Sequence, residues 1–374
     1  MIYREGRAAI RYHSKAFINP HAKLTRDIGT ALARLLLPKQ YSVLDPTAAT
    51  GVRGMRYALE GDAGSVTFLE INASAYKDLE RNVKSIPHGV GVRVLNTSVQ
   101  EFANTAHEKF DLIDLDPFGG AAPYIHDLLK LARDRTALFV TATDTAVLCG
   151  AHAKACARMY DAWPMHNVLS HETGLRILIG YVARAAAQYD SGISVELAFT
   201  YMHYMRAMIV LRHGAKSVDA TERELGYAYY CRKCCNAFYA MGRVPERQRC
   251  GFCGSEVEGA GPLWLGALKG TAASRVLADY SGDDDVPAYE RKFAAVLAEE
   301  PDVPLYYSIP HLTKSMGIPS VPIDAVIDAL RKSGSLAART SLEASCIKTD
   351  AEIGTVRDAV KNAAARRPNQ KRPV

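Results

Sequence analysis

The chain has 374 residues, 48% of them hydrophobic and 23% charged, with a formal net charge of +6. This length and composition predict a globular protein of two domains, or of one large domain with an appendage. The sequence has no apolar run of about 18 residues that could span a bilayer, and its start lacks the apolar core of a secretory signal, so we expect a cytoplasmic protein. The positive charge permits a polyanionic partner without requiring one.

Segments of strand length alternate with helical patterns in the first half of the chain. The candidate strands are 41–44, 65–72, 91–98, 110–116 and 136–144, and the candidate helices are 73–83 and 124–132. This alternation predicts an α/β fold with a parallel, doubly wound (Rossmann-like) sheet. Ligands of such sheets bind at the carboxyl ends of the strands, near the point where the strand order reverses.

Three carboxylates fall at predicted strand ends, namely Asp45, Glu70 and Asp116, and the sheet should bring them to one crevice. The loop from Thr47 to Gly54 is not a GxGxxG fingerprint, so it is poorly suited to a pyrophosphate. Its small residues favour a nucleoside ligand, and Glu70 is placed to accept hydrogen bonds from two ribose hydroxyls. S-adenosylmethionine is such a ligand. The alternative is a tight strand–helix turn beside an acidic strand end.

The segment DLIDLDPFGG (111–120) carries acidic residues to the end of an apolar strand. Asp114 and Asp116 are two positions apart and share one face of that strand. A carboxylate and a backbone carbonyl can accept hydrogen bonds from an exocyclic amine and aim its lone pair at a methyl donor. Pro117 fixes the carbonyl, and Phe118 can stack on an extruded base. The alternative, a strand terminator with a solvated aspartate, does not explain charges inside so apolar a strand.

Cysteines form two C-x-x-C pairs, Cys231 with Cys234 and Cys250 with Cys253. Their spacing predicts a tetrahedral structural zinc site, in which four sulfur ligands leave no open position for catalysis. Cys235 competes with Cys234 as a ligand, although the regular spacing favours Cys234. The alternative is a set of reduced, unbound thiols.

A polar, glycine-containing stretch over 211–227 predicts a domain boundary. We therefore expect the sheet domain over 1–215 and a smaller C-terminal α+β domain over 216–374. Within the second domain, 307–334 has the pattern of two helices joined by a turn, and a wing can follow through 336–351. This arrangement is typical of winged-helix modules, which can bind nucleic acid, but similar patterns also occur as inert packing.

Seven motifs run in order through almost the whole chain: FINPHAKLTRDIG (17–29), LDPTAATGVRGMR (44–56), DLDPFGG (114–120), TATDTAVLCGAHAKAC (141–156), HETGLRILIGYVAR (171–184), GPLWLGAL (261–268) and IKTDA (347–351). Together they resemble the tRNA (guanine-26-N2)-dimethyltransferase family of class I methyltransferases. The resemblance implies transfer of one or two methyl groups from S-adenosyl-L-methionine to the exocyclic N2 amine of guanine 26. It also implies tRNA as the partner, no membrane and no obligate protein partner.

The resemblance assigns roles to individual residues. Asp116 matches the catalytic carboxylate that positions the amine and accepts its proton, while Phe118 and Phe17 match aromatic residues that hold the flipped base. Arg26 matches an arginine expected to grip the methionine carboxylate, for which a guanidinium fork is well suited. With the strand-end residue Asp45 included, the expected cofactor-binding residues are Arg26, Arg53, Glu70, Asp45, Ser98 and Val99.

Other readings of the sequence explain less of it. An oxidoreductase would need a phosphate cradle that the loop after the first strand lacks, and a zinc-containing RNA-binding protein would leave Asp116 and Glu70 without a purpose. The nearest rival is an N2-methyltransferase of a neighbouring tRNA guanine or of an rRNA base. Two features bear on RNA binding. Ser341 and Leu342 stand where the family usually has a histidine–phenylalanine pair, and the basic tail 361–374 is either a phosphate-binding arm or a solvated end.

Overall fold

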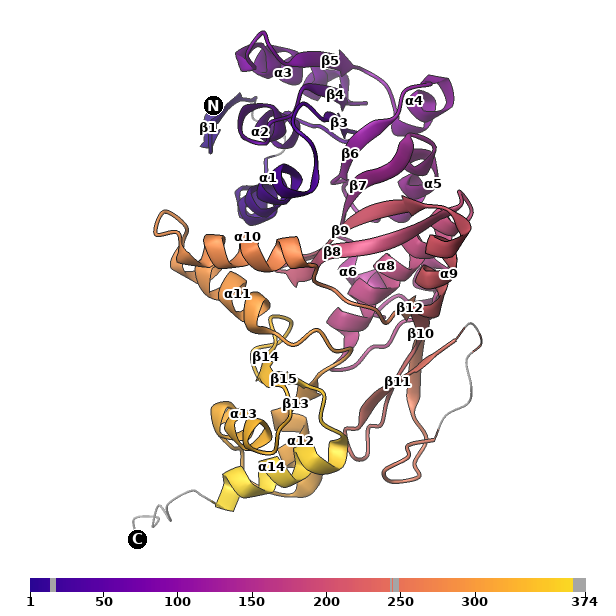
Figure 1. Cartoon of the computed structure of the whole chain (residues 1–374), viewed down its shortest axis with the longest axis vertical. Helices are drawn as coiled ribbons and strands as arrows, with labels where there is room; N and C mark the ends of the chain where they lie inside the picture. The colour runs from indigo at the N-terminus through magenta and orange to yellow at the C-terminus, as the bar shows by residue number, and fades with distance from the viewer. Residues whose placement is uncertain (14–17, 243, 245–248, 366–374) are drawn as a thin grey trace. The chain divides into compact units, whose positions relative to one another are not determined.

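A seven-stranded sheet is the centre of the first of two units into which the chain folds (Figure 1). The computed structural model describes residues 1–13, 18–242, 244 and 249–365. Unit 1 comprises Met1–Thr145, Tyr181–Glu222 and Leu268–Asp283. Unit 2 comprises Ala146–Gly180, Arg223–Ala267 and Asp284–Val374. Each unit is therefore assembled from three separate stretches of chain.

The strand order of the large sheet is β5-β4-β3-β6-β7-β9-β8. Strands β3 to β7 are parallel to one another, and the hairpin of β8 and β9 adds two antiparallel strands at one edge. The order reverses between β3 and β6, which confirms the predicted doubly wound sheet and sets a switch point there. The strands are β3 (Ser42–Asp45), β4 (Ser65–Leu69), β5 (Gly91–Leu95), β6 (Phe110–Leu115), β7 (Ala132–Ala142), β8 (Ser191–Tyr201) and β9 (Tyr204–His213).

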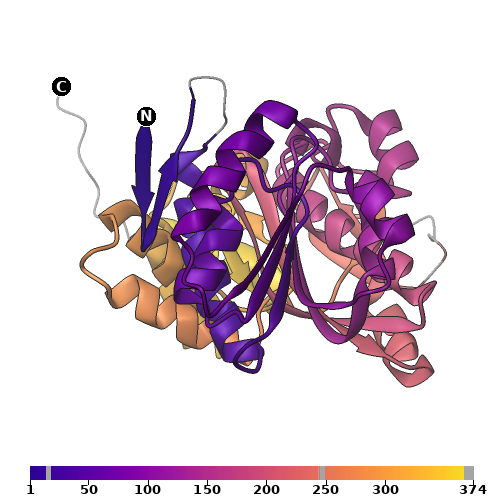
Figure 2. The same cartoon turned by 90° about the horizontal axis from the view of Figure 1, so that it is seen from above.

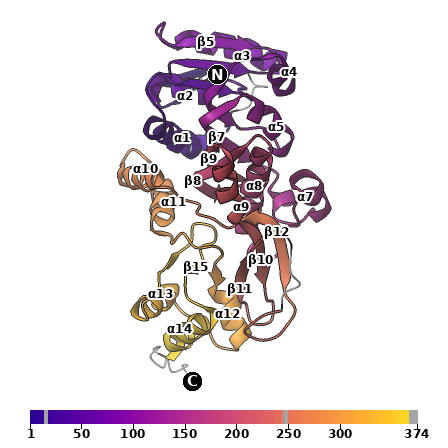
Figure 3. The ribbon, with the colours of Figure 1, turned by 45° about the vertical axis from the view of Figure 1, so that its right-hand side comes forward.

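Helices cover both faces of this sheet, as Figures 1 and 3 show, with α1–α3 on one face and α4 and α5 on the other. The view from above in Figure 2 shows the sheet between these helices. Asn72 begins α3 because its side chain accepts hydrogen bonds from the first turn, and Ser98 caps α4 in the same way. The helices of unit 1 are η1 (Pro20–Ala22), α1 (Lys23–Leu36), α2 (Val52–Glu60), α3 (Ala73–Asn82), η2 (Val83–Ser85), α4 (Val99–Thr105), α5 (Ala122–Lys130), α9 (Ala215–Arg223, which ends one residue beyond the unit) and α10 (Thr271–Gly282).

An antiparallel hairpin of β1 (Ile2–Glu5) and β2 (Ala8–Arg11) precedes α1 and was not foreseen from the sequence. Asn82 at the end of α3 fastens it: its Oδ1 accepts from the Arg11 N–H at 2.8 Å, and its Nδ2 donates to the Arg11 carbonyl at 3.0 Å. The hairpin carries Glu5, a buried carboxylate, into the interior of unit 1.

Unit 2 contains two small antiparallel sheets. The first, of order β11-β10-β12, consists of β10 (Leu225–Tyr230), β11 (Ala237–Met241) and β12 (Glu258–Trp264). The second, of order β13-β15-β14, consists of β13 (Tyr307–Ser308), β14 (Ala337–Arg339) and β15 (Cys346–Thr349). With α12 (Ile309–Met316) and α13 (Ile323–Lys332), the second sheet forms the predicted winged-helix-like element. The helices of unit 2 also include α7 (Ala153–Tyr160), α11 (Ala288–Glu299) and α14 (Ile353–Ala365). Two helices, α6 (Thr145–Leu148) and α8 (Ser170–Ala187), contain a boundary between the units, so that each belongs partly to both.

In the part of the chain that the structure describes, no helix is both long enough and apolar enough to cross a membrane.

Candidate active site and cysteine cluster

A cavity of about 320 Å³ lies at the carboxyl ends of the parallel strands of unit 1. This is the edge at which doubly wound sheets bind ligands, and the volume is within the range of small-molecule sites. The cavity is lined by every described residue for which the sequence predicted a cofactor or catalytic role, namely Arg26, Asp45, Arg53, Glu70, Ser98, Val99, Asp116 and Phe118. Phe17 lies outside the described residues.

Glu70, directly after β4, faces the loop that follows β3. Its Oε2 accepts the Ala49 N–H at 2.8 Å, and its Oε1 accepts the Asn72 N–H at 2.6 Å. The loop turns sharply into α2 through Gly51, whose φ is +87°. The positive φ favours glycine, and a Cβ here would also lie 2.5 Å from Leu79 Cδ1, so that the leucine side chain would have to shift.

Asp45 at the end of β3 is buried and accepts one hydrogen bond, from the Gly54 N–H at 3.0 Å. Burial raises its pKa to about 7, because desolvation penalises the carboxylate more than the nearby Arg53 stabilises it. The neighbouring carboxylates Asp114 and Asp116 raise this pKa further. Asp45 therefore changes its protonation state near neutral pH, whereas Asp114 and Asp116 have lowered pKa values.

Asp114 lies on β6, two residues before Asp116, which directly follows the strand, and Asp114 is fully buried. Arg206 of β9 grips it with two hydrogen bonds, Nη1 to Oδ1 at 2.7 Å and Nη2 to Oδ2 at 2.8 Å. The Tyr57 hydroxyl donates to Oδ2 at 2.5 Å, and Arg53 Nη1 lies 3.3 Å from the same oxygen. Burial acts to raise the pKa of Asp114, but the two guanidinium groups outweigh it and hold the pKa below its usual value.

Asp116 is the only member of this group that reaches the cavity with a partly exposed side chain, at 30% of its surface against 0% for Asp114. Arg53 bridges the two carboxylates, since its Nη2 donates to Asp116 Oδ2. Burial acts to raise the pKa of Asp116, and the charges of Arg53 and Arg206 lower it overall. Asp116 is thus an ionised hydrogen-bond acceptor at neutral pH. It is the last member of a row of ion pairs that runs from Arg206 through Asp114 and Arg53.

Phe118 follows Asp116 on the loop after β6 and is 74% exposed although it lines the cavity. The loop reverses at Gly119, whose φ is +86° and whose N–H donates to Thr143 Oγ1 at 2.8 Å. A large aromatic face at the rim of a cavity is suited to stacking on a flat ligand.

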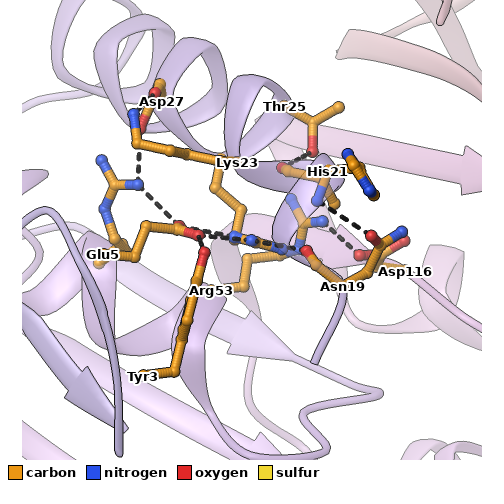
Figure 4. Close-up of polar contacts among 12 residues, drawn as sticks. Tyr3, Glu5, Asn19, His21, Lys23, Thr25, Asp27, Arg53 and Asp116 are labelled. Carbon is orange, nitrogen blue, oxygen red and sulfur yellow. Dashed lines mark hydrogen bonds and ion pairs between the residues drawn. The ribbon is translucent and has the colours of Figure 1, made fainter. Parts of the chain in front are cut away.

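Arg26 is buried, and its guanidinium donates to the carboxylate of Glu5 in the N-terminal hairpin. Figure 4 shows the polar contacts that meet at the Glu5 carboxylate. The Nε–Oε1 and Nη2–Oε2 distances are 2.7 and 2.5 Å, and Nη2 also donates to the Asn19 carbonyl at 3.0 Å. Burial acts to raise the pKa of Glu5, but the hydrogen bonds and charge of Arg26 lower it to about 2. The predicted contact of Arg26 with a methionine carboxylate stays a prediction.

Ser98 and Val99 stand at the start of α4, where the cavity wall meets that helix. The Ser98 hydroxyl accepts the Glu101 N–H at 3.1 Å, so it is engaged in capping the helix. Val99 is buried and offers its apolar side chain to the same wall. An apolar and polar wall of this kind can border the edge of a purine.

Four cysteine sulfurs gather in unit 2, all within 4.8 Å of one another: those of Cys231, Cys234, Cys250 and Cys253. The closest pairs are Cys231–Cys253 at 3.5 Å and Cys234–Cys250 at 3.4 Å. Cys235 is not a member of the group. It adopts a positive φ of 63° and donates its N–H to the Cys231 carbonyl at 2.8 Å, which shapes the turn of the first pair.

Sequence reasoning missed four residues that build the site: Glu5, Tyr57, Tyr204 and Arg206. Glu5 lies in a short hairpin with no motif, and Arg206 lies in an apolar strand where a lone arginine gives no sign of its partner. A buried charge in an apolar strand must be paired, so that rule predicts an acidic partner for Arg206 but does not say which residue it is.

The fold and the site together define a class I methyltransferase: a doubly wound sheet with an acidic residue after its second strand and an Asp-Pro-Phe segment after its fourth. The family model described as "N2,N2-dimethylguanosine tRNA methyltransferase" matches residues 2–361. The chain belongs to this family, as the resemblance of its motifs predicted.

Curated relatives and a solved structure agree with the family model. The chain is 36% identical to the tRNA (guanine(26)-N(2))-dimethyltransferase of Thermococcus kodakarensis, over 94% of each chain. It is 32% identical to the enzyme of the same name from Methanothermobacter thermautotrophicus, over 92% of each chain. The solved structure of Trm1 from Pyrococcus horikoshii in complex with S-adenosyl-L-methionine aligns with a TM-score of 0.88 and 34% identity, over 96% of this chain and 99% of that one.

Proposed function

We propose that this protein transfers one or two methyl groups from S-adenosyl-L-methionine to the exocyclic N2 amine of guanine 26 in tRNA. The observation that carries the proposal is the shared cavity of Glu70 and Asp116, with Asp116 held ionised by Arg53 at its partly exposed end. The names of the relatives, and the ligand named for the Pyrococcus horikoshii structure, support the same reaction.

The residues of the cavity fit an adenosine ligand without a pyrophosphate. The Glu70 carboxylate borders the cavity and suits two ribose hydroxyls, while Ala48 and Ala49 leave room beside it. Ser98 and Val99 would border the adenine, and Arg26 and Arg53 would lie toward the methionine part. When bound, S-adenosyl-L-methionine supplies an electrophilic methyl group.

Asp116 has two tasks in this proposal. Its carboxylate and the Pro117 carbonyl accept hydrogen bonds from the amine, so that the nitrogen lone pair is directed at the methyl group. After transfer the nitrogen is cationic and strongly acidic, so even a weakly basic carboxylate can accept its proton. Phe118, and Phe17 outside the described residues, would stack on the extruded base.

We further propose that Cys231, Cys234, Cys250 and Cys253 bind a structural zinc ion in unit 2. Four thiols within 4.8 Å of one another match a tetrahedral sulfur site, which leaves no position for a reacting water. Replacing Cys231 with Ser should release the metal and lower the thermal stability of the protein, whereas Cys235→Ser should retain it. Zinc content by mass spectrometry of the purified variants checks this, and equal zinc in both would contradict the assignment.

Residues 1–215 would then carry out methyl transfer, and residues 216–374 would bind tRNA through the winged-helix-like element and the basic tail, most of which lies outside the described residues. In place of the family's histidine–phenylalanine pair stands Ser341, whose N–H and hydroxyl donate to Glu300 Oε2 at 2.9 and 2.7 Å, followed by Leu342. We therefore do not expect this position to make the contact that the family's pair would make. A cytoplasmic location follows from the proposed substrate.

The experiment that tests the function is incubation of unmodified tRNA with the protein and S-adenosyl-L-methionine, followed by mass spectrometry of nucleosides and mapping of the modified position. N2-methyl- or N2,N2-dimethylguanosine at position 26 is the expected product, and their ratio measures how far methylation proceeds. Product at a neighbouring guanine, or only when rRNA is supplied, would support the alternative target. No N2-methylated guanosine in either RNA would contradict the proposal.

A further inference from the structure

Tyr204, the first residue of β9, lines the same cavity as Asp116 and Phe118. The residue is 5% exposed, and its ring packs against Tyr201 with centroids 5.9 Å apart and planes inclined by 57°. The two tyrosines face each other across the β8–β9 hairpin, where they form a cross-strand pair. Packing against Tyr201 thereby fixes the ring of Tyr204 in the absence of a ligand.

The hydroxyl of Tyr204 is buried without a hydrogen-bond partner among the described residues. Leaving a buried hydroxyl unpaired costs on the order of 1–3 kcal/mol, so native proteins rarely do so without a reason. The described part of the chain holds other such atoms, on Tyr41, Thr200, Arg206, Glu172 and Arg176. Only that of Tyr204 belongs to a residue of the cavity wall.

The charge state of this hydroxyl defines what it can bind. Burial raises the pKa of Tyr204 well above its usual value, and the nearby Tyr201 and the carboxylate of Asp116 raise it further. Arg53 and Arg206 lower it by less. The phenol is therefore neutral at every working pH and carries an O–H donor, and its residue lines the same cavity as Asp116.

The Watson–Crick edge of guanine offers a complementary pattern. Its N2 amine and N1–H are donors, which a carboxylate accepts, and its O6 is the one acceptor of that edge. A neutral phenol and an ionised carboxylate in the wall of one cavity are therefore the two kinds of partner that this edge requires.

We infer that Tyr204 is a guanine-recognition residue, whose hydroxyl donates a hydrogen bond to O6 of the base whose N2 amine meets Asp116. This inference rests on the proposed function and deepens it, because it names the group that distinguishes guanine from other bases carrying an amine. Adenine has an amine where guanine has O6, so it would leave the hydroxyl without its acceptor.

Tyr204→Phe removes the hydroxyl and keeps the ring, and Tyr41→Phe is a matched control. Tyr41 also carries a buried hydroxyl without a partner in the described structure, but it is not a residue of the cavity wall. Both variants should be at least as stable to heat as the wild type, since each loses an unsatisfied polar group. Tyr204→Phe should lower kcat/KM for guanine-26 tRNA about tenfold, while Tyr41→Phe leaves it unchanged.

A tRNA with 2-aminopurine at position 26 separates recognition of the base from support of Asp116, because this base keeps the N2 amine and lacks O6. On it, Tyr204→Phe and wild type should transfer methyl groups at rates within about twofold of each other. Undiminished activity of Tyr204→Phe on guanine, or an equal loss on both bases, would overturn the inference. A wild type that does not methylate guanine 26 at all overturns the proposed function first, and the inference with it.

Discussion

Each unit of the protein buries a cluster of charged side chains, and the two clusters differ in whether one of their charges is exposed to a cavity. The cavity cluster of unit 1 consists of Arg206, Asp114, Arg53 and Asp116. The closed cluster of unit 2 consists of Glu172, Arg176, Lys348 and Glu300. In the closed cluster no side chain is more than 7% exposed, whereas Asp116 in the cavity cluster is 30% exposed. One cluster opens onto a ligand site and the other does not.

The closed cluster joins segments of unit 2 that are distant in sequence. Glu172 Oε1 accepts from Arg176 Nε at 2.9 Å, Lys348 Nζ at 3.0 Å and the Leu305 N–H at 2.9 Å. Arg176 Nη1 in turn donates to the carbonyls of Trp264 and Gly266. These contacts are all buried inside the unit, and they hold α8, the end of β12, Leu305 and β15 together.

The difference shows that burying charges serves two purposes in this chain. Desolvation makes an isolated buried charge costly, and in both clusters the charges alternate in sign and are joined by hydrogen bonds. In unit 1 the last charge of the cluster is Asp116, whose partly exposed carboxylate borders the cavity. We therefore expect variants of the cavity cluster to affect chemistry at its open end, and variants of the closed cluster to affect stability.

The largest effect is expected for Asp116→Asn. The amide keeps the shape and one acceptor but cannot take a proton or hold the amine with a full charge, so methyl transfer should fall about 10²–10⁴-fold. Affinity for S-adenosyl-L-methionine, measured by calorimetry, should change little. Single-turnover transfer of a labelled methyl group to tRNA measures the loss.

Asp111→Asn is the matched control on the same strand. Asp111 is ion-paired with Arg133 and accepts a hydrogen bond from the Ser42 N–H at 2.9 Å, but it does not line the cavity. Its replacement should leave turnover near that of the wild type. Comparable losses in the two variants would show that the open end of the cavity cluster has no special role.

Glu172→Gln tests the closed cluster. Removing this charge leaves Arg176 and Lys348 buried without their common carboxylate, and breaking a buried pair in this way costs about 3–5 kcal/mol of unfolding free energy. Denaturant unfolding followed by circular dichroism measures it. The exposed pair of Lys361 and Asp358 provides the reference, since Asp358→Asn should cost less than about 0.5 kcal/mol. Equal losses of unfolding free energy in Glu172→Gln and Asp358→Asn would contradict the expectation that the buried cluster contributes more to stability than the exposed pair.

Asp45→Asn sharpens the comparison through pH. Asp45 has a pKa raised from 3.8 to about 7, so the folded state holds its proton more tightly than the unfolded state and the wild type loses stability as pH rises from about 4 to 7. Asparagine cannot ionise. The stability of the variant relative to wild type should therefore increase by about 3 kcal/mol between pH 5 and pH 8.

Glu172 has the opposite sign, because its pKa is lowered: burial acts to raise it, but Lys348 and Arg176 outweigh burial. Its contribution is present above the usual glutamate pKa and is lost as pH falls through the lowered value. Urea midpoints of wild type and Asp45→Asn at pH 5 and pH 8 check the first sign, and those of wild type and Glu172→Gln at pH 5 and pH 3 check the second. A difference between Asp45→Asn and wild type that does not change with pH would contradict the raised pKa of Asp45.

Much of the sheet could be predicted from the sequence. Apolar strands that alternate with amphipathic helices fix the doubly wound topology, and that topology brings Asp45, Glu70 and Asp116 to one edge. Local spacing also selected Cys234 over Cys235, because two residues between cysteines allow a turn whose sulfurs point to one side. Such predictions depend on short stretches of chain and on rules common to all parallel sheets.

The partners of the buried charges could not be predicted in this way. Arg206 reaches Asp114 across 92 positions of sequence, through the pairing of β6 with β7 and of β7 with β9. A shift of one residue in either pairing would turn Arg206 to the other face of the sheet. Glu5 likewise meets Arg26 only because a hairpin without a motif packs beside α1 and α2.

The sequence by itself determined the class of fold, the edge of the sheet that carries the site, the acidic residues on that edge and the family to which the chain belongs. The tertiary structure alone decided that Asp116 is held by Arg53, that the pKa of Asp45 is raised while that of Asp114 is lowered, and that Tyr204 lines the cavity. The physical reason is that strand order follows from local patterns, whereas the charge of a buried group depends on which distant side chains share its low-dielectric surroundings.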